Sequence, residues 1–304
     1  MTSNIAAGAS AVRAEGSAPT PGAASLPLRV MTAVIFVPIL VFLAWIGGVA
    51  YLAFVLIVLA LSMRELLHLL ESKGLHPHWK TGMVAVLLAP IAMVQRVRTG
   101  RLEEWHVSGL MTVLVVAVLL AELRRGAGRQ AIANSAATLL AVLYVGWLGT
   151  HLVALRELTW ITGESYARGM AYALLPFVLV WVCDTAAYLV GKRWGRHRLM
   201  PDVSPRKTAE GAWGGLLASI GAAFVARATF APFLTALDAA LLGILVGVFG
   251  QLGDLVESLI KRDAVTKNTS ELIPGHGGVL DRFDSLLFAA PVVYYYLLFR
   301  LTPP

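Results

Sequence analysis

The sequence contains a single cysteine, Cys183, among its 304 residues. One cysteine excludes an intramolecular disulfide framework and a metal cage built from several thiolates, so we expect Cys183 to fill apolar space. Charge is scarce as well: Asp, Glu, Lys and Arg make up 14% of the chain, whereas soluble domains carry about 25%. Because 58% of the residues are hydrophobic, the composition indicates a polytopic membrane protein.

The apolar residues form long runs and lack the alternating ten-residue pattern of a membrane β-barrel. Such runs suit helices of about 20 residues, the length that crosses a bilayer core. We therefore predict an all-α polytopic membrane protein with about nine transmembrane helices. The expected spans are 30–46, 49–63, 81–95, 108–123, 131–155, 171–190, 213–234, 237–260 and 285–301. Only Gly47 and Gly48 separate the first two, which could instead form one long bent helix and reverse the sidedness of all later loops.

The net charge of +7 comes from basic residues in short loops between the spans. No single basic face is predicted, so nucleic acid is not an expected partner. Most of the 25 lysines and arginines fall on the side of the N-terminus, which predicts a cytoplasmic N-terminus by the positive-inside bias. We expect a disordered tail at 1–28, membrane helices at 29–170 and a second membrane region at 171–304. Its polar loops, 191–212 and 261–284, would both emerge on the cytoplasmic face.

A stripe of polar residues runs along the eighth expected span. Asp254, Glu257, Ser258 and Lys261 follow the spacing i, i+3, i+4 and i+7, which places them on one helical face. Charged residues at membrane depth usually serve a function. The alternative is that Glu257 only pairs with Lys261 across one helical turn.

Two further carboxylates, Asp281 and Asp284, stand three residues apart at the start of the ninth span. They could simply cap that helix, whose N-terminus stabilises negative charge. They could also hold a hard divalent cation, because Mg²⁺ prefers carboxylate oxygen together with substrate phosphate. Just before them, Pro274–Gly278 contains three glycines whose backbone N–H groups could approach an anion. Taken alone, this glycine run could be only a turn.

Asp184 lies within the otherwise apolar sixth span, where a carboxylate needs a partner. Its partner could be a substrate or metal, or a Thr or Tyr of a neighbouring helix. Four residues of the loop that follows combine cations with hydroxyl groups, as phosphate binding requires: Ser204, Arg206, Lys207 and Thr208. We interpret the other cations of that loop as topology signals or lipid-headgroup contacts.

Taken together, these residues resemble the phosphatidate cytidylyltransferase family, also called CDP-diacylglycerol synthases. The C-terminal motif here reads Ser258-Leu-Ile-Lys261-Arg262, then Lys267, then Pro274-Gly-His276-Gly-Gly278-Val-Leu-Asp281-Arg282-Phe-Asp284. Upstream stand Asp184-Thr-Ala-Ala-Tyr188 and Ser204-Pro-Arg-Lys207-Thr208-Ala-Glu210-Gly211, in family order. The resemblance is strong over 181–285 and only hydrophobic before that.

The resemblance implies that CTP and phosphatidic acid react to give CDP-diacylglycerol and pyrophosphate, in a membrane site formed by 171–304. It implies Mg²⁺ as cofactor, with room for a second cation, and Asp254, Asp281 and Asp284 as metal ligands. Lys261 and Arg262 join these aspartates as implied catalytic residues. The implied substrate contacts are Asp184, Ser204, Arg206, Lys207, Thr208, Lys267, His276, Gly277, Gly278 and Arg282. The lipid phosphate arrives ionised, so we assign no general base.

Such an enzyme is expected in the bacterial inner membrane with its site facing the cytoplasm. One departure is Asn268 after Lys267, where the family usually has Asp. A CTP-dependent lipid kinase is a close alternative, because it needs similar metal and phosphate groups. A transporter would favour inverted repeats, which we do not see, and a non-catalytic scaffold is kept open by Asn268. Gly243 and Gly247 would permit close helix packing, within one chain or in a homodimer.

Overall fold

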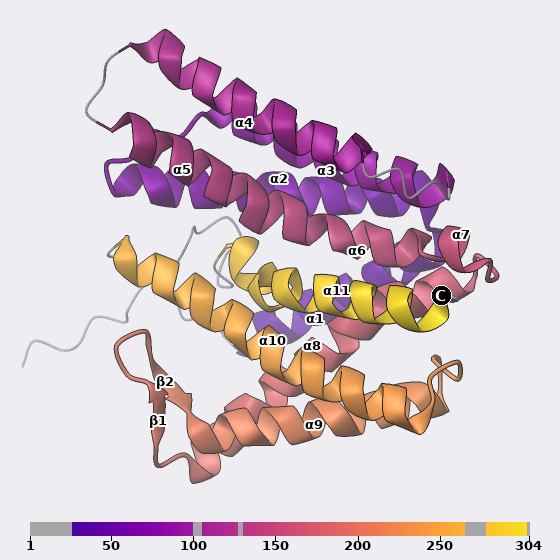
Figure 1. Cartoon of the computed structure of the whole chain (residues 1–304). Coiled ribbons are helices and arrows are strands. Elements are labelled where there is room, and N and C mark those ends of the chain that lie inside the picture. The colour runs from indigo at the N-terminus through magenta and orange to yellow at the C-terminus, as the bar shows by residue number, and fades with distance from the viewer. Residues whose placement is uncertain (1–25, 100–104, 127–129, 265–277, 303–304) are drawn as a thin grey trace, which may run out of the picture.

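The computed structural model describes residues 26–99, 105–126, 130–264 and 278–302, which are almost entirely helical (Figure 1). The first group of helices is α1 (Leu26–Ile46), α2 (Gly48–Ser72), α3 (Trp79–Thr99), α4 (Trp105–Arg125), α5 (Ala131–Ala141), the π-helix η1 (Val142–Trp147), α6 (Leu148–Glu157) and the short α7 (Thr159–Thr162). The second group is α8 (Arg168–Trp194), α9 (Ala209–Ala228), α10 (Ala236–Asp263) and α11 (Leu280–Leu301). A two-stranded sheet, β1 (Arg198–Met200) and β2 (Ser204–Thr208), lies between α8 and α9.

Within the described ranges, seven helical segments are long and apolar enough to cross a membrane. They are α2, α3, the continuous segment Ala131–Glu157, α8, α9, α10 and α11. The apolar part of α1 that qualifies, Val34–Ile46, is shorter than the roughly 20 residues that a span needs. The last turn of α4 carries Arg124 and Arg125. An all-α polytopic membrane protein is therefore confirmed, whereas the count of nine spans is not.

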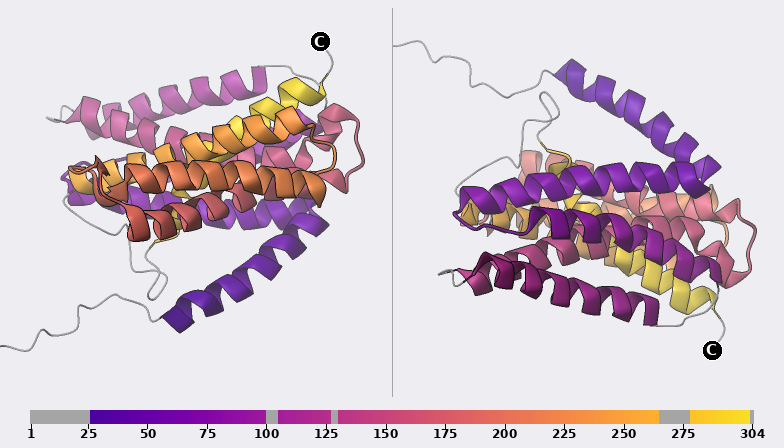
Figure 2. Two further views of the ribbon diagram at one scale, coloured as in Figure 1. Left: turned by 90° about the horizontal axis from the view of Figure 1, so that it is seen from below. Right: turned by 90° about the horizontal axis from the view of Figure 1, so that it is seen from above.

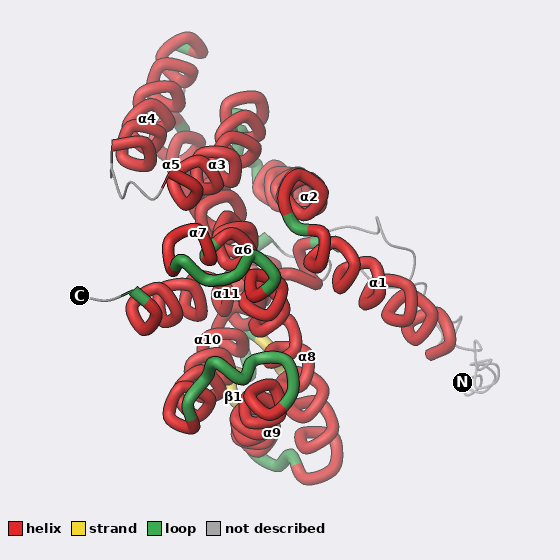
Figure 3. The backbone as a smooth tube through the Cα atoms, turned by 90° about the vertical axis from the view of Figure 1, so that its right-hand side faces the viewer, coloured by secondary structure: helices red, strands yellow, loops and turns green. Residues whose placement is uncertain are grey.

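The first two helices are separate rather than one bent helix. Gly47 and Gly48 have φ values of 68° and 52°, in the left-handed region that other residues adopt only at a cost. Helix α1 consequently leaves the rest of the bundle at an angle (Figure 2, Figure 3). The side chain of Arg156 holds this break, donating hydrogen bonds to the carbonyl oxygens of Ala44 at 2.6 Å and Trp45 at 3.2 Å. Arg156 lies just beyond the expected span 131–155, yet it is completely buried.

Glycines bring the helices of the second group into close contact. A Cβ added at Gly243 would lie 2.5 Å from the Cα of Ile220 on α9, and one at Gly247 would lie 2.7 Å from a methyl group of Leu216. These two glycines therefore serve the α9–α10 interface within the chain. Cys183 is buried in the same region, as expected.

The segment expected as loop 191–212 contains regular structure. Helix α8 continues to Trp194, the antiparallel strands β1 and β2 follow, and α9 already begins at Ala209. The sheet is short, and its two strands pair Arg198 with Thr208 and Met200 with Ser204. It lies at the end of the bundle where α10 ends and α11 begins (Figure 1). The polar strands that precede α9 therefore lie at the same end of the bundle as the polar residues at the end of α10 and the start of α11.

Candidate active site

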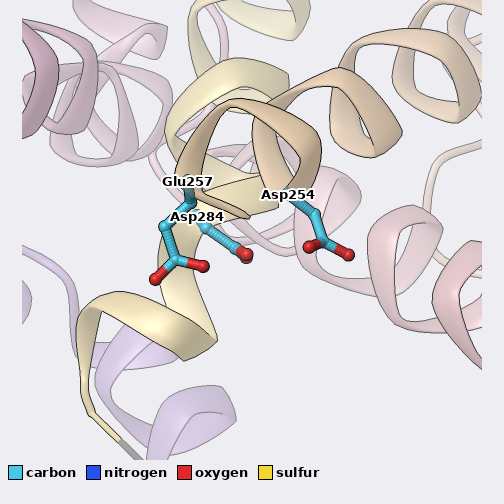
Figure 4. A group of neighbouring side chains, drawn as sticks. All are labelled: Asp254, Glu257 and Asp284. Carbon is cyan, nitrogen blue, oxygen red and sulfur yellow. The ribbon is translucent and has the colours of Figure 1, made fainter. Parts of the chain in front are cut away.

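Three carboxylates meet where α10 packs against the start of α11 (Figure 4). One oxygen each of Asp254, Glu257 and Asp284 lies within 4.8 Å of the others. The helices approach this closely because Gly253 has no side chain: a Cβ there would lie 2.6 Å from the backbone oxygen of Asp284. Glu257 and Asp284 are buried, with 1% and 7% of their surface exposed. Carboxylate oxygens in such a group are suitable ligands for Mg²⁺.

One oxygen of this cluster has no partner among the residues that the structure describes. Glu257 Oε1 is buried and accepts no hydrogen bond from the described residues, whereas its Oε2 lies 2.6 Å from Lys261 Nζ. A buried acceptor without a partner costs free energy unless a ligand satisfies it. The donor set and this free oxygen fit a bound cation.

Lys261 connects the cluster to Asp281, which we had expected among the metal ligands. The Nζ atom of Lys261 lies 3.0 Å from Asp281 Oδ1, and Asp281 Oδ2 accepts a hydrogen bond from the backbone N–H of Gly278 at 2.9 Å. The structure thus groups Asp254 and Asp284 with Glu257, and places Asp281 beside Lys261. The pairing of Glu257 with Lys261, the alternative interpretation of this stripe, is present as well.

Strand β2 adds cations to the same site. Lys207 Nζ lies 2.6 Å from Asp254 Oδ2, and the Ser258 hydroxyl donates to Asp254 Oδ1 at 3.3 Å. Arg262 Nε donates to the carbonyl oxygen of Val203 at 3.2 Å, which ties α10 to the β1–β2 turn. The two polar segments therefore meet, although they are far apart in the sequence.

A pocket of about 180 Å³ opens between β2 and the end of α10. Its lining residues are Ser204, Pro205, Arg206, Ser258, Lys261 and Arg262. Two arginines, a lysine and two serines offer the charge and the hydrogen-bond donors that phosphate oxygens require. All six belong to the motifs recognised in the sequence.

The remaining expected contacts are placed differently. The hydroxyl of Thr208 accepts a hydrogen bond from the backbone N–H of Gly211 at 3.2 Å and so caps α9. Asp184 is exposed on α8, yet interacts electrostatically with Asp254 and Lys207. Within the described residues Asp184 makes no hydrogen bond to a Thr or Tyr of a neighbouring helix, which was the alternative to a substrate or metal partner. Arg282 is exposed. Lys267, Asn268, His276 and Gly277 lie outside the described residues.

The sequence analysis missed Glu65, because we ended the second span at residue 63. Helix α2 continues to Ser72, and its buried Glu65 accepts hydrogen bonds from the backbone N–H groups of Val279 at 2.9 Å and Leu280 at 2.8 Å. A carboxylate at this position satisfies the free N–H groups of a helix start. Glu65 therefore anchors the beginning of α11, which carries Asp281 and Asp284. The signal that could have revealed Glu65 in the sequence was a carboxylate so close to an apolar run.

Comparison with known proteins supports the assignment of these motifs. The model of the cytidylyltransferase family matches residues 27–300. A phosphatidate cytidylyltransferase from Synechocystis sp. is 33% identical over 297 residues, covering 90% of this chain and 97% of that protein. Proteins of the same name from Staphylococcus epidermidis and Bacillus subtilis are 31% and 30% identical, each covering 88% of this chain. The chain therefore belongs to the cytidylyltransferase family, as its C-terminal motifs had indicated.

Proposed function

We propose that this protein is a phosphatidate cytidylyltransferase, a nucleotidyltransferase of phospholipid biosynthesis that converts CTP and phosphatidic acid into CDP-diacylglycerol and pyrophosphate. The observation that carries the proposal is the meeting of the acidic cluster with the cationic pocket at one end of the helices. Family membership supports the same reaction. In that reaction an oxygen of the lipid phosphate forms a bond to the α-phosphorus of CTP, and the bond between this phosphorus and the β-phosphate oxygen breaks.

The main obstacle is repulsion between two anionic substrates. Arg206 and Arg262 line the pocket and would bind phosphate oxygens, while Lys261 stands between the pocket and the carboxylates. Lys207 is positioned to stabilise charge that develops near Asp254. Because the attacking phosphate oxygen is already ionised, no residue has to remove a proton from it.

Asp254, Glu257 and Asp284 would hold Mg²⁺, with Asp281 next to them as a further carboxylate for a second cation. Mg²⁺ bound there would neutralise the triphosphate and the departing pyrophosphate. The protein's own residues then orient the two substrates: the pocket receives phosphate groups, and the apolar helices keep the lipid chains in the membrane. Lys267, His276 and Gly277 complete the proposed substrate contacts.

The proposal includes the orientation of the site. The bias of Lys and Arg toward the loops at this end supports a cytoplasmic face in the bacterial inner membrane, where CTP is available. We assign the chemistry to 171–304 and a supporting role to 29–170. A homodimer stays a prediction, because Gly243 and Gly247, the residues that suggested it, contact α9 of the same chain.

The test uses purified protein in detergent with phosphatidic acid and Mg²⁺. Lipid-extractable label from α-labelled CTP, and none from terminally labelled CTP, is the expected result, and Asp281→Asn should abolish it while the protein stays folded. Asp263→Asn is the matched control, since this exposed aspartate on α10 pairs with Lys73 outside the cluster. Sealed inside-out vesicles should convert external CTP, and right-side-out vesicles should not.

Other outcomes separate the alternatives. Lipid label that comes only from the terminal phosphate identifies a lipid kinase. If neither label reaches lipid, Asn268→Asp is tested next, because restored conversion would mean a disabled enzyme. Continued absence of product would contradict the proposed function and favour a non-catalytic role.

A further inference from the structure

The membrane segment Ala131–Glu157 contains one turn of π-helix, η1. A π-helical turn inserts an extra residue into a helix and is frequently found at functional sites. Here it carries Tyr144, which is 5% exposed. Tyr144 belongs to the half of the chain in which the sequence analysis identified no family motif.

Packing places Tyr144 beside the acidic cluster. Its ring contacts that of Phe288, with ring centroids 6.3 Å apart and an interplanar angle of 69°. Phe288 stands one helical turn after Asp284 on α11, and its Cβ would lie 3.1 Å from a Cβ added at Gly253. Tyr144 thus reaches across to the junction of α10 and α11 at the level where the carboxylates meet.

The hydroxyl of Tyr144 is buried and has no hydrogen-bond partner among the described residues. Buried tyrosine hydroxyls usually have one, because an unsatisfied polar group costs free energy. Asp284, Glu257 and Asp254 all act electrostatically on this hydroxyl, with Asp284 first. A donor lies near several acceptors but bonds none of them, and Glu257 Oε1 is a second unsatisfied atom in the same site.

We infer that the Tyr144 hydroxyl donates a hydrogen bond to a phosphate oxygen of the substrate bound at the acidic cluster, so that the N-terminal helices contribute a substrate-contacting residue. This inference rests on the proposed function, and the phosphate is that of CTP or of phosphatidic acid. A phenol is suited to this role because it donates without adding charge to a site that already holds opposite charges.

Tyr51 and Tyr172 are two other tyrosines with buried hydroxyls that lack a hydrogen-bond partner among the described residues. The charge that acts on Tyr51 is Arg156, at the break between α1 and α2, and none of the site carboxylates acts on it. Tyr51 therefore offers a control with the same chemistry and burial.

The experiment compares Tyr144→Phe and Tyr51→Phe with the unaltered protein by CDP-lipid formation, varying CTP and phosphatidic acid separately. Loss of a hydrogen bond to a charged phosphate should lower kcat/KM by about 10- to 100-fold in Tyr144→Phe, and Tyr51→Phe should stay within about threefold. A rise in KM confined to one substrate identifies whose phosphate is contacted, and a fall in kcat alone identifies a contact made in the transition state.

Thermal unfolding guards against a loss of fold, because removing an unpartnered hydroxyl should leave the melting temperature unchanged or raise it. Tyr144→Met, which keeps the apolar bulk, should show the same activity loss. Tyr144→Phe with unaltered kinetics beside an active parent protein overturns this inference alone. A parent protein that makes no CDP-lipid, either as it stands or with Asn268→Asp, overturns the proposed function and this inference together.

Discussion

The two halves of the chain bury charged side chains in different ways. In the N-terminal half, Arg156 is completely buried and donates to three carbonyl oxygens, those of Ala44, Trp45 and Tyr166. In the C-terminal half, Glu257 is 1% exposed and bonds Lys261 through one oxygen, while the other has no partner in the part of the chain that the structure describes.

Charge at membrane depth is usually taken as a sign of function, and this comparison refines that rule. Each of the three side-chain nitrogens of Arg156 donates to a carbonyl oxygen of the protein, so this charge has little left to offer a substrate. A buried charge with an unused oxygen next to other carboxylates is costly by itself and gains free energy when a cation or substrate binds. The degree of satisfaction, rather than burial, separates Arg156 from Glu257.

The largest expected effect concerns Glu257, whose side chain has one oxygen without a partner among the described residues. If the cluster holds Mg²⁺ as proposed, Glu257→Gln removes a negative charge from it and should weaken Mg²⁺ binding. We expect a loss of activity of about 1000-fold at fixed Mg²⁺, since cation stabilisation of the transition state amounts to several kcal/mol. Titration of activity against Mg²⁺ should show that higher concentrations recover part of the rate. Unfolding temperature without Mg²⁺ should change little, because Lys261 loses its pair with Glu257 but keeps the one with Asp281.

Asp263→Asn, with its exposed side chain at the end of the same helix, should leave activity and Mg²⁺ dependence unaltered. A Glu257→Gln protein with normal Mg²⁺ dependence would show that Asp281, not Glu257, completes the metal site.

Substitution of Arg156, whose side chain is hydrogen-bonded to the protein, should instead lower stability and leave kcat unchanged. Arg156→Met removes three hydrogen bonds to carbonyl oxygens, of which the one to Ala44 is buried, and this should lower the free energy of unfolding by about 3 kcal/mol. The kcat of the folded protein should not change, because Arg156 lies at the opposite end of α2 from the site. Thermal unfolding in detergent and kcat per folded molecule are the two measurements. Arg168→Met is the control: this exposed arginine pairs with Glu164 one turn away at the same end, and surface pairs contribute little.

A drop in kcat for Arg156→Met at full folding would break the comparison, since a satisfied charge would then influence the chemistry.

Local sequence patterns predicted the parts of the site that lie on one helix face or in one motif. The stripe on α10, the aspartates at the start of α11 and the cations of β2 came from spacing and residue type alone. Their meeting could be expected once both segments were assigned to one membrane face. The β1–β2 hairpin was not predicted, because its short strands carry Lys and Arg rather than an alternating apolar pattern.

Contacts between distant segments could not be predicted in this way. Glu65 bonds Val279, 214 positions along the chain, and Tyr144 packs on Phe288. Neither residue has a local pattern that names its partner, because the packing of α2 and η1 against α11 decides both contacts. The count of nine spans is not confirmed for a similar reason: hydropathy alone does not distinguish a helix that crosses a membrane from one that lies beside the helices that do, as for α1 and α4.

Glu65 lies between the two categories and gives the smallest expected effect. It is a buried charge whose two oxygens are both used, like Arg156, but the groups it binds belong to the helix that carries Asp281 and Asp284. Glu65→Gln replaces one acceptor by a donor facing a backbone N–H. We expect a loss of about 1–2 kcal/mol in unfolding free energy and a fall in kcat of about 10-fold, because the start of α11 shifts.

Glu71→Gln, on the same helix but part-exposed, should change kcat little. The measurement that matters is kcat per folded molecule across a temperature series below unfolding. A Glu65→Gln protein that loses stability but keeps its full kcat would place Glu65 with Arg156, as a charge that only holds the fold. If stability and kcat fall together, Glu65, a buried charge with both oxygens bonded to the protein, affects catalysis through the helix that it anchors. Whether the hydrogen bonds of a buried charge are all made within the protein then predicts whether that residue touches substrate, but not whether catalysis depends on it.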